Sequence, residues 1–240
     1  TGEDVMELGL KDRRAIVTGG SKGLGFAIAQ ELIREGATVR ICARNTEEVA
    51  AAVDKLGEQA GGQAVDVRDA SQLSTFMTWA AESMGGIDIL VNNVGAGDLD
   101  HMGLGGFLDS DDSQWHHLLN LNLFSAVWTS KAALPSLIER RGAIVNLGSV
   151  NARFPSTGPV GYSEAKAALV AFGKRLSEEF GPQGVRVNTV SPGPVGTGLW
   201  RDPDGFGAQV AAANGAPHAD FLAAMPAVFG ITSGRISEPE

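Results

Sequence analysis

The sequence contains few of the residues that build disulfides and metal sites. Its 240 residues include one cysteine, one tyrosine and four histidines. A single cysteine excludes an internal disulfide, and Cys42 lies in an apolar strand pattern, which indicates a small core residue. The histidines are scattered, and the adjacent His116 and His117 would point to different helix faces. No metal site is therefore predicted.

Positive charge and long apolar runs are also scarce. Lys and Arg number 19 against 28 Asp and Glu, and the net charge of −9 argues against nucleic acid or an anionic membrane as the main partner. No apolar run approaches the ~18 to 20 residues that span a bilayer. Residues 1–7 are acidic and do not resemble a secretion signal. We therefore expect a cytoplasmic protein.

Strand-like and helix-like stretches alternate along the chain. Strands are expected at 14–18, 37–42, 63–65, 87–91, 142–147 and 185–190, and helices at 26–36, 46–56, 70–84, 113–138 and 160–180. Short turns between these elements predict an α/β fold, a parallel sheet with helices on both faces. Length and composition fit a single domain over residues 1–240, with residues 1–9 as a tail.

A glycine-rich turn joins the first strand to the first helix. Residues 19–25 read Gly-Gly-Ser-Lys-Gly-Leu-Gly, and a second strand follows the helix. Glycines let the backbone approach a pyrophosphate, and the N–H groups at the start of a helix favour its negative charge. This βαβ unit predicts a dinucleotide-binding loop.

Further candidate segments follow the later strands. Asp66-Val67 comes after the third strand, residues 92–95 after the fourth, Ser149 after the fifth and Pro192-Gly193 after the sixth. Parallel strands end at one edge of the sheet, which is where such folds bind ligands. We expect these segments to converge there.

The single tyrosine precedes a lysine by one helical turn. Tyr162 and Lys166 would share one helix face. Bringing a phenol from its ordinary pKa near ~10 to about 7 requires about 4 kcal/mol. One lysine charge at about 4 Å supplies that amount in an effective dielectric near 20. The pair is therefore predicted to exchange a proton near neutral pH.

Taken together, these motifs resemble those of the classical short-chain dehydrogenases/reductases. The resemblance runs from about residue 8 to residue 240, and its motifs are residues 18–25, Asn92-Asn-Val-Gly95, Asn122, Ser149, Tyr162-x-x-x-Lys166 and residues 192–197. The family's usual Asn-Asn-Ala-Gly contains a valine here. The resemblance implies a Rossmann-type, doubly wound sheet, a nicotinamide cofactor, oxidation or reduction at a carbonyl/alcohol carbon, and a homodimer or homotetramer.

The resemblance also implies residue roles. Tyr162 would exchange the proton with the substrate oxygen, and Ser149 would hydrogen-bond that oxygen. Lys166 would lower the tyrosine pKa and hold the nicotinamide ribose, and Asn122 would bend its helix and position a water. The expected cofactor-binding residues are Gly19, Ser21, Lys22, Gly23, Leu24, Gly25, Arg44, Asp66, Val67, Asn93, Val94, Gly95, Tyr162, Lys166, Pro192, Val195 and Thr197.

The charges near the second strand favour NADP over NAD. NAD-binding members of such folds usually have an acid after this strand, which binds the ribose 2′-hydroxyl. Here Ala43 takes that position and Arg44 follows it. Lys22 adds a second cation inside the glycine loop, and two cations without a carboxylate suit a 2′-phosphate.

The substrate is less well defined by the sequence. The acidic, glycine-rich residues 96–114 are expected to form one lip of the site, and the aromatic-containing residues 198–229 a mobile lid. Carrier-protein reductases of the family often have arginine where this chain has Gln183. A free small ketone, sugar or polyol is therefore preferred over a 3-oxoacyl thioester. A non-catalytic NADP-binding regulator is the alternative of another class, although Ser149, Tyr162 and Lys166 are all present.

The last residues resemble the segment that opens a final helix in the family, with Ser237 as its N-cap. We expect that helix and a seventh strand to follow Glu240, over roughly 20 to 30 residues. Without them, the strand at 185–190 would present an unpaired edge.

Overall fold

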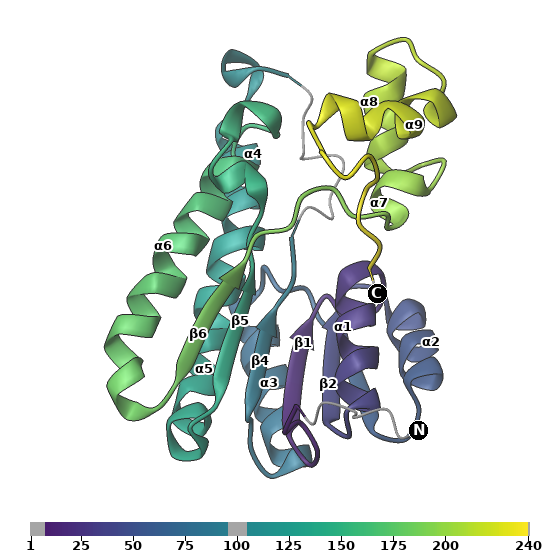
Figure 1. The fold of residues 1–240 in the computed structure, drawn as a ribbon. Helices are drawn as coiled ribbons and strands as arrows, with labels where there is room; N and C mark the ends of the chain where they lie inside the picture. Colours follow the sequence, from purple (N-terminus) through teal and green to yellow (C-terminus); the bar gives the residue numbers. More distant parts are fainter. Residues whose placement is uncertain (1–7, 96–104, 240) are drawn as a thin grey trace.

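The computed structural model describes residues 8–95 and 105–239. Its centre is a six-stranded parallel sheet with the order β3-β2-β1-β4-β5-β6 (Figure 1). The strands are β1 (Arg14–Thr18), β2 (Thr38–Ala43), β3 (Ala60–Ala64), β4 (Ile89–Asn92), β5 (Ala143–Leu147) and β6 (Arg186–Val190). Strand order reverses between β1 and β4, as in a doubly wound fold. The predicted fold class is confirmed.

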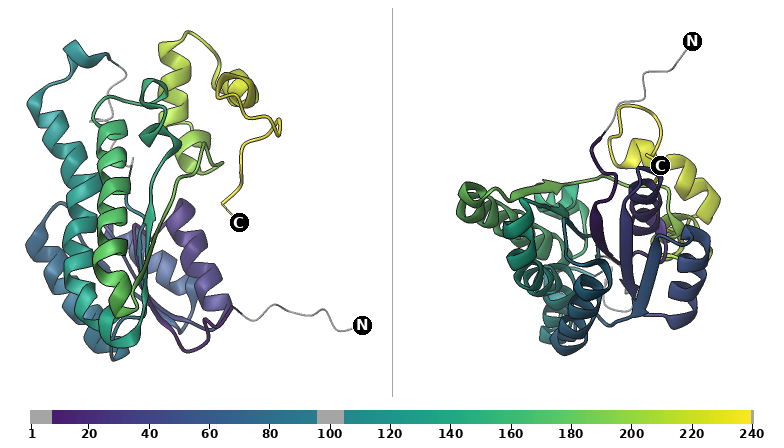
Figure 2. Two further views of the ribbon diagram at one scale, coloured as in Figure 1. Left: turned by 60° about the vertical axis from the view of Figure 1, so that its left-hand side comes forward. Right: turned by 90° about the horizontal axis from the view of Figure 1, so that it is seen from below.

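Helices cover both faces of the sheet. Helices α1 (Gly23–Arg34) and α2 (Thr46–Leu56) pack on one face, and α3 (Ala70–Met84), α5 (Ser125–Arg140) and α6 (Tyr162–Phe180) pack on the other (Figures 1 and 2). Each face has its own apolar core. Ala29, Ala52 and Leu56 belong to the first core, and Phe76 and Leu137 belong to the second.

The helices begin and end where the sequence supplies capping groups. The side chain of Asn45 accepts a hydrogen bond from the backbone N–H of Glu48 at the start of α2. Asp69 accepts bonds from Ser71 and Gln72 at the start of α3, which ends at Gly85 in the left-handed conformation (φ 72°). Such caps satisfy backbone groups that have no partner within the helix.

Strand β3 lies earlier than the expected 63–65. It contains two glycines, which are poor strand formers. Close packing explains one of them, because a Cβ at Gly62 would lie 2.8 Å from Val49 Cγ1 and 2.9 Å from Ile41 Cγ1. Helix α2 therefore approaches β3 more closely than a larger residue would allow.

The single helix expected over 113–138 is wrong. The structure has α4 (Asp112–Leu119), then one π-helical turn, η3 (Asn120–Phe124), and then α5. The backbone N–H of Ser125 bonds to the carbonyl of Asn120, five residues earlier. The wider turn leaves the Leu118 carbonyl to the side chain of Asn122, whose Nδ2 donates to it at 3.0 Å. The predicted bend at Asn122 is thus a π-turn.

Three short helices stand beyond the carboxyl ends of the strands: α7 (Gly198–Arg201), α8 (Phe206–Ala213) and α9 (His218–Val228) (Figure 1). They correspond to the segment predicted as a lid. The Trp200 ring contacts the rings of Phe206, Phe221 and Phe229, with centroids 5.6, 6.4 and 5.6 Å away. These aromatic side chains hold the three helices together.

No helix of the described residues covers one part of the sheet. On the α1 side, β4, β5 and β6 line an apolar groove of about 480 Å³ together with Leu24, Ile28 and Leu32 of α1. β6 is the last strand of the sheet order, and Val190 is 52% exposed. Ser237, predicted as a helix cap, instead pairs with Val195 in an isolated bridge. The further helix and strand after Glu240 remain a prediction.

Candidate functional site

The glycine loop follows β1 and leads directly into α1. Gly19 and Gly23 have φ values of +66° and +58°, which favour glycine. A Cβ at Gly25 would collide with the Gly19 carbonyl oxygen and lie 2.5 Å from Asn93 Nδ2. No side chain caps α1 and no acid lies in its first turn. Its N–H groups can therefore receive a phosphate, and the loop fits the predicted dinucleotide.

The end of β4 is fastened to this loop by two side chains. Thr18 Oγ1 accepts hydrogen bonds from the backbone N–H groups of Asn93 (3.1 Å) and Val94 (3.3 Å). Asn93 Nδ2 donates to the carbonyls of Thr18 (2.9 Å) and Gly19 (3.1 Å). Hydrogen bonds thus join the start of the glycine loop to the end of β4, although these segments are about 75 residues apart in sequence.

The predicted 2′-phosphate site contains a carboxylate that the sequence did not indicate. Lys22 Nζ lies 3.1 Å from Glu48 Oε1 at the start of α2. Ser21 Oγ donates to the other oxygen of Glu48 at 3.4 Å. Glu48 therefore holds the two loop residues.

Asp66 and Val67 follow β3, as predicted. The Arg68 guanidinium donates to both Asp66 oxygens, with distances of 2.9 and 3.1 Å from Nε and 2.6 Å from NH2. This pairing lowers the pKa of Asp66, and the charge of Arg44 adds to the effect. Val67 is buried in the apolar core. Asp66 is thus a fixed, ionised acceptor near the expected cofactor.

The segment after β6 lies against the glycine loop. A Cβ at Gly23 would be 3.5 Å from Thr197 Cγ2. The Pro192 carbonyl accepts a bond from the Val150 N–H at 3.0 Å. Val195 pairs with Ser237, as described above. Residues 192–197 thus join the cofactor loop to the residue after Ser149.

The predicted catalytic side chains come from three elements. Ser149 follows β5, and Tyr162 is the first residue of α6. Lys166 lies one turn later in α6, with Nζ 5.9 Å from the centroid of the Tyr162 ring. Its ammonium donates to the carbonyl of Leu147 at 2.7 Å and to that of Val94 at 3.5 Å. The carboxyl ends of β4 and β5 thus fix the lysine.

Asn122 reaches the same place from the π-turn. A Cβ at Gly95 would lie 2.6 Å from Lys166 Nζ and 2.9 Å from Asn122 Oδ1, so only glycine fits between them. Asn122 is buried, and its Oδ1 has no hydrogen-bond partner among the described residues. Buried polar atoms are normally paired. This oxygen therefore suits the predicted water beside Lys166.

Burial governs the titration of the tyrosine and the lysine. Desolvation raises the pKa of Tyr162, and a hydrogen bond with Ser149 opposes the rise. Desolvation lowers the pKa of Lys166 from 10.5 to about 7. The causes of the Tyr162 shift do not include the charge of Lys166, so the lowering of the tyrosine pKa by this lysine stays a prediction.

The lid packs over this group. Leu118 and Phe206 form a small core with Tyr162, Leu199 and Trp200. The expected acidic lip is only partly described, since Asp98 and Asp100 lie outside the described residues. Asp109 and Asp111 serve as caps by accepting bonds from the N–H groups of Gly106 and Gln114.

The sequence did not reveal two polar neighbours of the site, Glu48 and Asn151. Asn151 lies two residues after Ser149 and hydrogen-bonds its hydroxyl at 3.0 Å. For Asn151, the only clue in the sequence is its position between Ser149 and Tyr162. Glu48 gave none, since it is one of two acids in the first turn of α2.

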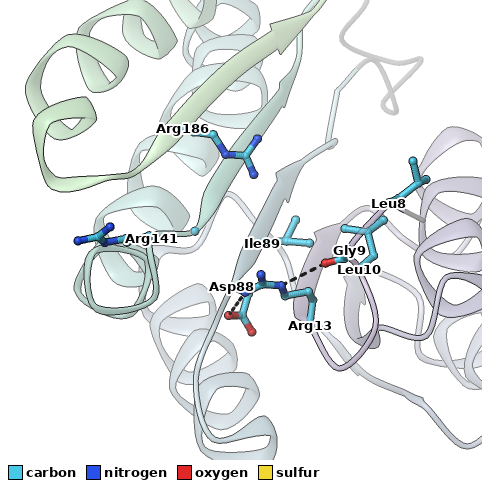
Figure 3. A pocket seen from close by; sticks show the side chains of 9 residues that line it. Leu8, Gly9, Leu10, Arg13, Asp88, Ile89, Arg141 and Arg186 are labelled. Atoms are coloured by element: carbon cyan, nitrogen blue, oxygen red, sulfur yellow. Dashed lines mark hydrogen bonds and ion pairs between the residues drawn. The ribbon is translucent and has the colours of Figure 1, made fainter. Parts of the chain in front are cut away.

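A second hollow, of about 270 Å³, lies at the amino ends of β4, β5 and β6 (Figure 3). Arg13, Arg141 and Arg186 line it with Asp88, which pairs with Arg13 at 3.5 Å. The length of the strands separates it from the site above.

The described residues contain no cluster of His, Cys, Asp and Glu able to hold a metal. No helix in the described part of the chain has the length and apolar character needed to cross a membrane.

Comparisons with known proteins agree with this geometry. The model of the short chain dehydrogenase family matches residues 13–204. The chain is 36% identical to 3-oxoacyl-[acyl-carrier-protein] reductase from Vibrio harveyi over 80% of this chain and 77% of that protein. The corresponding Escherichia coli enzyme is 34% identical over 78% and 75%.

Solved structures are similar over almost the whole chain. L-sorbose reductase from Gluconobacter frateurii, in complex with NADPH and L-sorbose, superposes with a TM-score of 0.88 at 29% identity, over 98% of this chain and 88% of that one. A short chain oxidoreductase from Pseudomonas aeruginosa, described as containing an atypical catalytic center, gives 0.83 at 33% identity over 96% and 87%.

Proposed function

We propose that this chain, which belongs to the short-chain dehydrogenase family, reduces the carbonyl group of a small polyhydroxylated ketone with Tyr162 as proton donor. Its reaction class is NADP-dependent oxidoreduction between a carbonyl and an alcohol. The observation that carries the proposal is the meeting of Tyr162, Ser149, Lys166 and Asn122 beside the glycine loop.

NADPH supplies the hydride when it is bound. Tyr162 gives its hydroxyl proton to the carbonyl oxygen of the substrate as that oxygen gains negative charge. Ser149 donates a hydrogen bond to the same oxygen and stabilises the charge. The raised pKa of Tyr162 keeps the phenol protonated at neutral pH, which suits reduction.

Lys166 serves the tyrosine in two ways. In its charged form it stabilises the phenolate that remains when Tyr162 has lost its proton. With a pKa of about 7 it also gains and loses a proton readily at neutral pH. We infer that it passes a proton from the Asn122 side of the site to Tyr162.

The cofactor site is proposed from the residues that surround the glycine loop. The N–H groups of the loop and of α1 would hold the pyrophosphate. Lys22 and Arg44 would bind the 2′-phosphate, and Asp66 and the backbone of Val67 would contact the adenine. Asn93, Val94, Gly95, Pro192, Val195 and Thr197, with Lys166 and Tyr162, would enclose the nicotinamide half.

The substrate proposal rests on structural likeness together with charge. The L-sorbose reductase structure matches 98% of this chain. The acidic composition and Gln183 fit poorly with an acidic carrier protein as partner. The second candidate, a 3-oxoacyl thioester, is favoured by the identity of 36% to a carrier-protein reductase.

Following NADPH consumption distinguishes these candidates. We would offer L-sorbose, ethyl acetoacetate and acetoacetyl-CoA, each with NADPH and with NADH. The proposal expects the highest kcat/KM with L-sorbose and NADPH. A preference for acetoacetyl-CoA would support the thioester candidate. NADPH binding without turnover of any of the three would support the non-catalytic regulator.

We also propose a cytoplasmic homo-oligomer. Within residues 8–95 and 105–239, no strand pairs with the outer edge of β6. This edge and the apolar groove beside α1 support assembly, because isolated proteins rarely expose such surfaces. A monomer in sedimentation at micromolar concentration would contradict this proposal.

A further inference from the structure

Asn151 forms two hydrogen bonds with the hydroxyl group of Ser149, one through its side chain and one through its backbone N–H. Ser149 Oγ donates to Asn151 Oδ1 at 3.0 Å and accepts a bond from the Asn151 backbone N–H at 3.1 Å. Asn151 lies in the 3-10 turn η4 (Val150–Ala152), directly after Ser149. The short turn thus brings its side chain back to the serine.

The other end of the amide is also held. Asn151 Nδ2 donates to Thr157 Oγ1 at 2.8 Å, and that hydroxyl donates to the Phe154 carbonyl at 2.7 Å. A Cβ at Gly158 would lie 2.7 Å from both Cγ and Nδ2 of Asn151. The amide therefore occupies a defined slot between Ser149 and Thr157.

This arrangement has a consequence for the serine proton. A serine hydroxyl has one proton, and here it points to Asn151 Oδ1. The Ser149 hydroxyl also hydrogen-bonds Tyr162, and this bond lowers the pKa of the phenol, so Tyr162 and Asn151 Oδ1 compete for the one serine proton. Ser149 cannot donate to a substrate oxygen until Asn151 releases this proton.

We propose that Asn151 is a positioning residue that controls whether Ser149 is a donor. Rotating the amide by half a turn places Nδ2 against Ser149 Oγ and Oδ1 against Thr157. Ser149 then accepts a bond from Asn151 and turns its own proton toward the substrate oxygen. Thr157 can turn its proton from Phe154 to Oδ1, so every group stays paired. No proton leaves Ser149, and this inference rests on the proposed role of that residue.

The choice of asparagine follows from this exchange. A primary amide offers an acceptor and a donor at the two ends of one planar group. Aspartate would always accept and would hold the serine proton away from the substrate. Alanine would leave Ser149 bonded only to the backbone N–H. Asn151→Asp should therefore impair the reaction more than Asn151→Ala.

A double-mutant cycle tests the proposal. Asn151→Asp and Asn151→Ala are each made in the native chain and in Ser149→Ala, and kcat and KM are measured for L-sorbose and ethyl acetoacetate with NADPH. In the native chain, Asn151→Asp should lower kcat roughly 100-fold, the scale of a lost oxyanion donor, with little change in KM. Asn151→Ala should lower kcat about fivefold, the scale of one neutral hydrogen bond. In Ser149→Ala, neither change should add as much as a twofold loss.

Two controls make the outcomes decisive. Asn188→Asp introduces the same charge at an exposed position of β6 and should leave kcat unchanged. Thr157→Val removes the donor that the rotated amide needs and should lower kcat without altering NADPH binding, measured by cofactor fluorescence. Equal losses in both serine backgrounds, or native kcat in Asn151→Asp, would overturn the proposal. Native kcat in Ser149→Ala itself would instead overturn the proposed function on which it rests.

Discussion

At the scale of single residues, Glu48 bears on the preference for NADP. The sequence places two cations and no acid at the expected 2′-phosphate site, yet the folded chain brings a carboxylate within 3.1 Å of Lys22. The Lys22 side chain is 78% exposed and that of Glu48 is 40% exposed. A 2′-phosphate must compete with Glu48 for this lysine, so the preference is weaker than the cations alone would give.

Replacing Glu48 tests this competition. Glu48→Gln should tighten NADPH binding by up to about fivefold, the range of an exposed ion pair, because Lys22 becomes free to bind the phosphate. NADH binding should hardly change. Fluorescence titration with both cofactors measures the effect, and Glu47→Gln, in the same helical turn, is the matched control. Equal tightening in both variants would show a general charge effect and contradict the specific pairing.

The sequence predicted the residues whose spacing is set by local structure. Tyr162 and Lys166 share a helix face, and the glycine loop lies between β1 and α1, so periodicity and turns were enough. It could not predict the partners of Lys22 or Ser149. Those depend on which rotamers meet across loops, as with Glu48, which is 26 residues from Lys22.

At the scale of elements, the π-turn at η3 separates two helices that the sequence presents as one. The polar and apolar periodicity continues through both, and inserting one residue into a turn leaves little trace in it. The result is functional, because the turn directs Asn122 toward Gly95 and Lys166. Helix periodicity therefore predicts that residues 113–138 are helical but does not predict the π-turn that divides them.

Gly95 lies close to both Asn122 and Lys166, so Gly95→Ala tests whether the packing of η3, α6 and the end of β4 matters for activity. The new Cβ would lie 2.6 Å from Lys166 Nζ and must displace it. We expect kcat to fall on the order of 100-fold, as for a misplacement of about 1 Å at a catalytic group. Gly181→Ala, where a Cβ meets nothing within 4 Å, is the control and should keep native kcat. Native activity in Gly95→Ala would mean that Lys166 need not stay where the structure has it.

At the scale of the whole molecule, the buried Lys166 links stability to pH. Its folded pKa is about 7 against an ordinary 10.5, so between these values the unfolded chain binds more protons. Stability due to this group is therefore fully present above the ordinary pKa and is lost as pH falls toward 7. Burial raises the pKa of Cys42 from 9.0 to about 12, which gives the opposite slope above pH 9. Between pH 7 and pH 9, the pH dependence of stability should therefore reflect Lys166 and not Cys42.

Lys166→Met should remove this dependence. In the native chain the free energy of unfolding should rise by roughly 2 kcal/mol from pH 7 to pH 9. In the variant it should stay nearly level, since methionine does not titrate. Urea denaturation at several pH values gives the comparison. A rise of the same size in both proteins would assign the dependence to other groups.

The architecture as a whole was predictable because alternating strands and helices leave few topologies for a parallel sheet. The sequence does not predict what covers the groove between α1 and β6. Leu24, Ile28 and Val190 show only that an apolar surface is present there. The expected helix and strand after Glu240 and self-association are both compatible with it. The mass of the intact native protein tests the first of these.

Tyr162 is expected to donate the proton in the NADPH-dependent reduction. Tyr162→Phe removes one oxygen atom and leaves the ring that packs with Leu118 and Phe206. Turnover of L-sorbose and ethyl acetoacetate should fall by at least about 100-fold, the lower range for general acid catalysis. NADPH binding and the unfolding temperature should stay near native values. Native turnover in Tyr162→Phe, with the cofactor bound, would show that another group donates the proton.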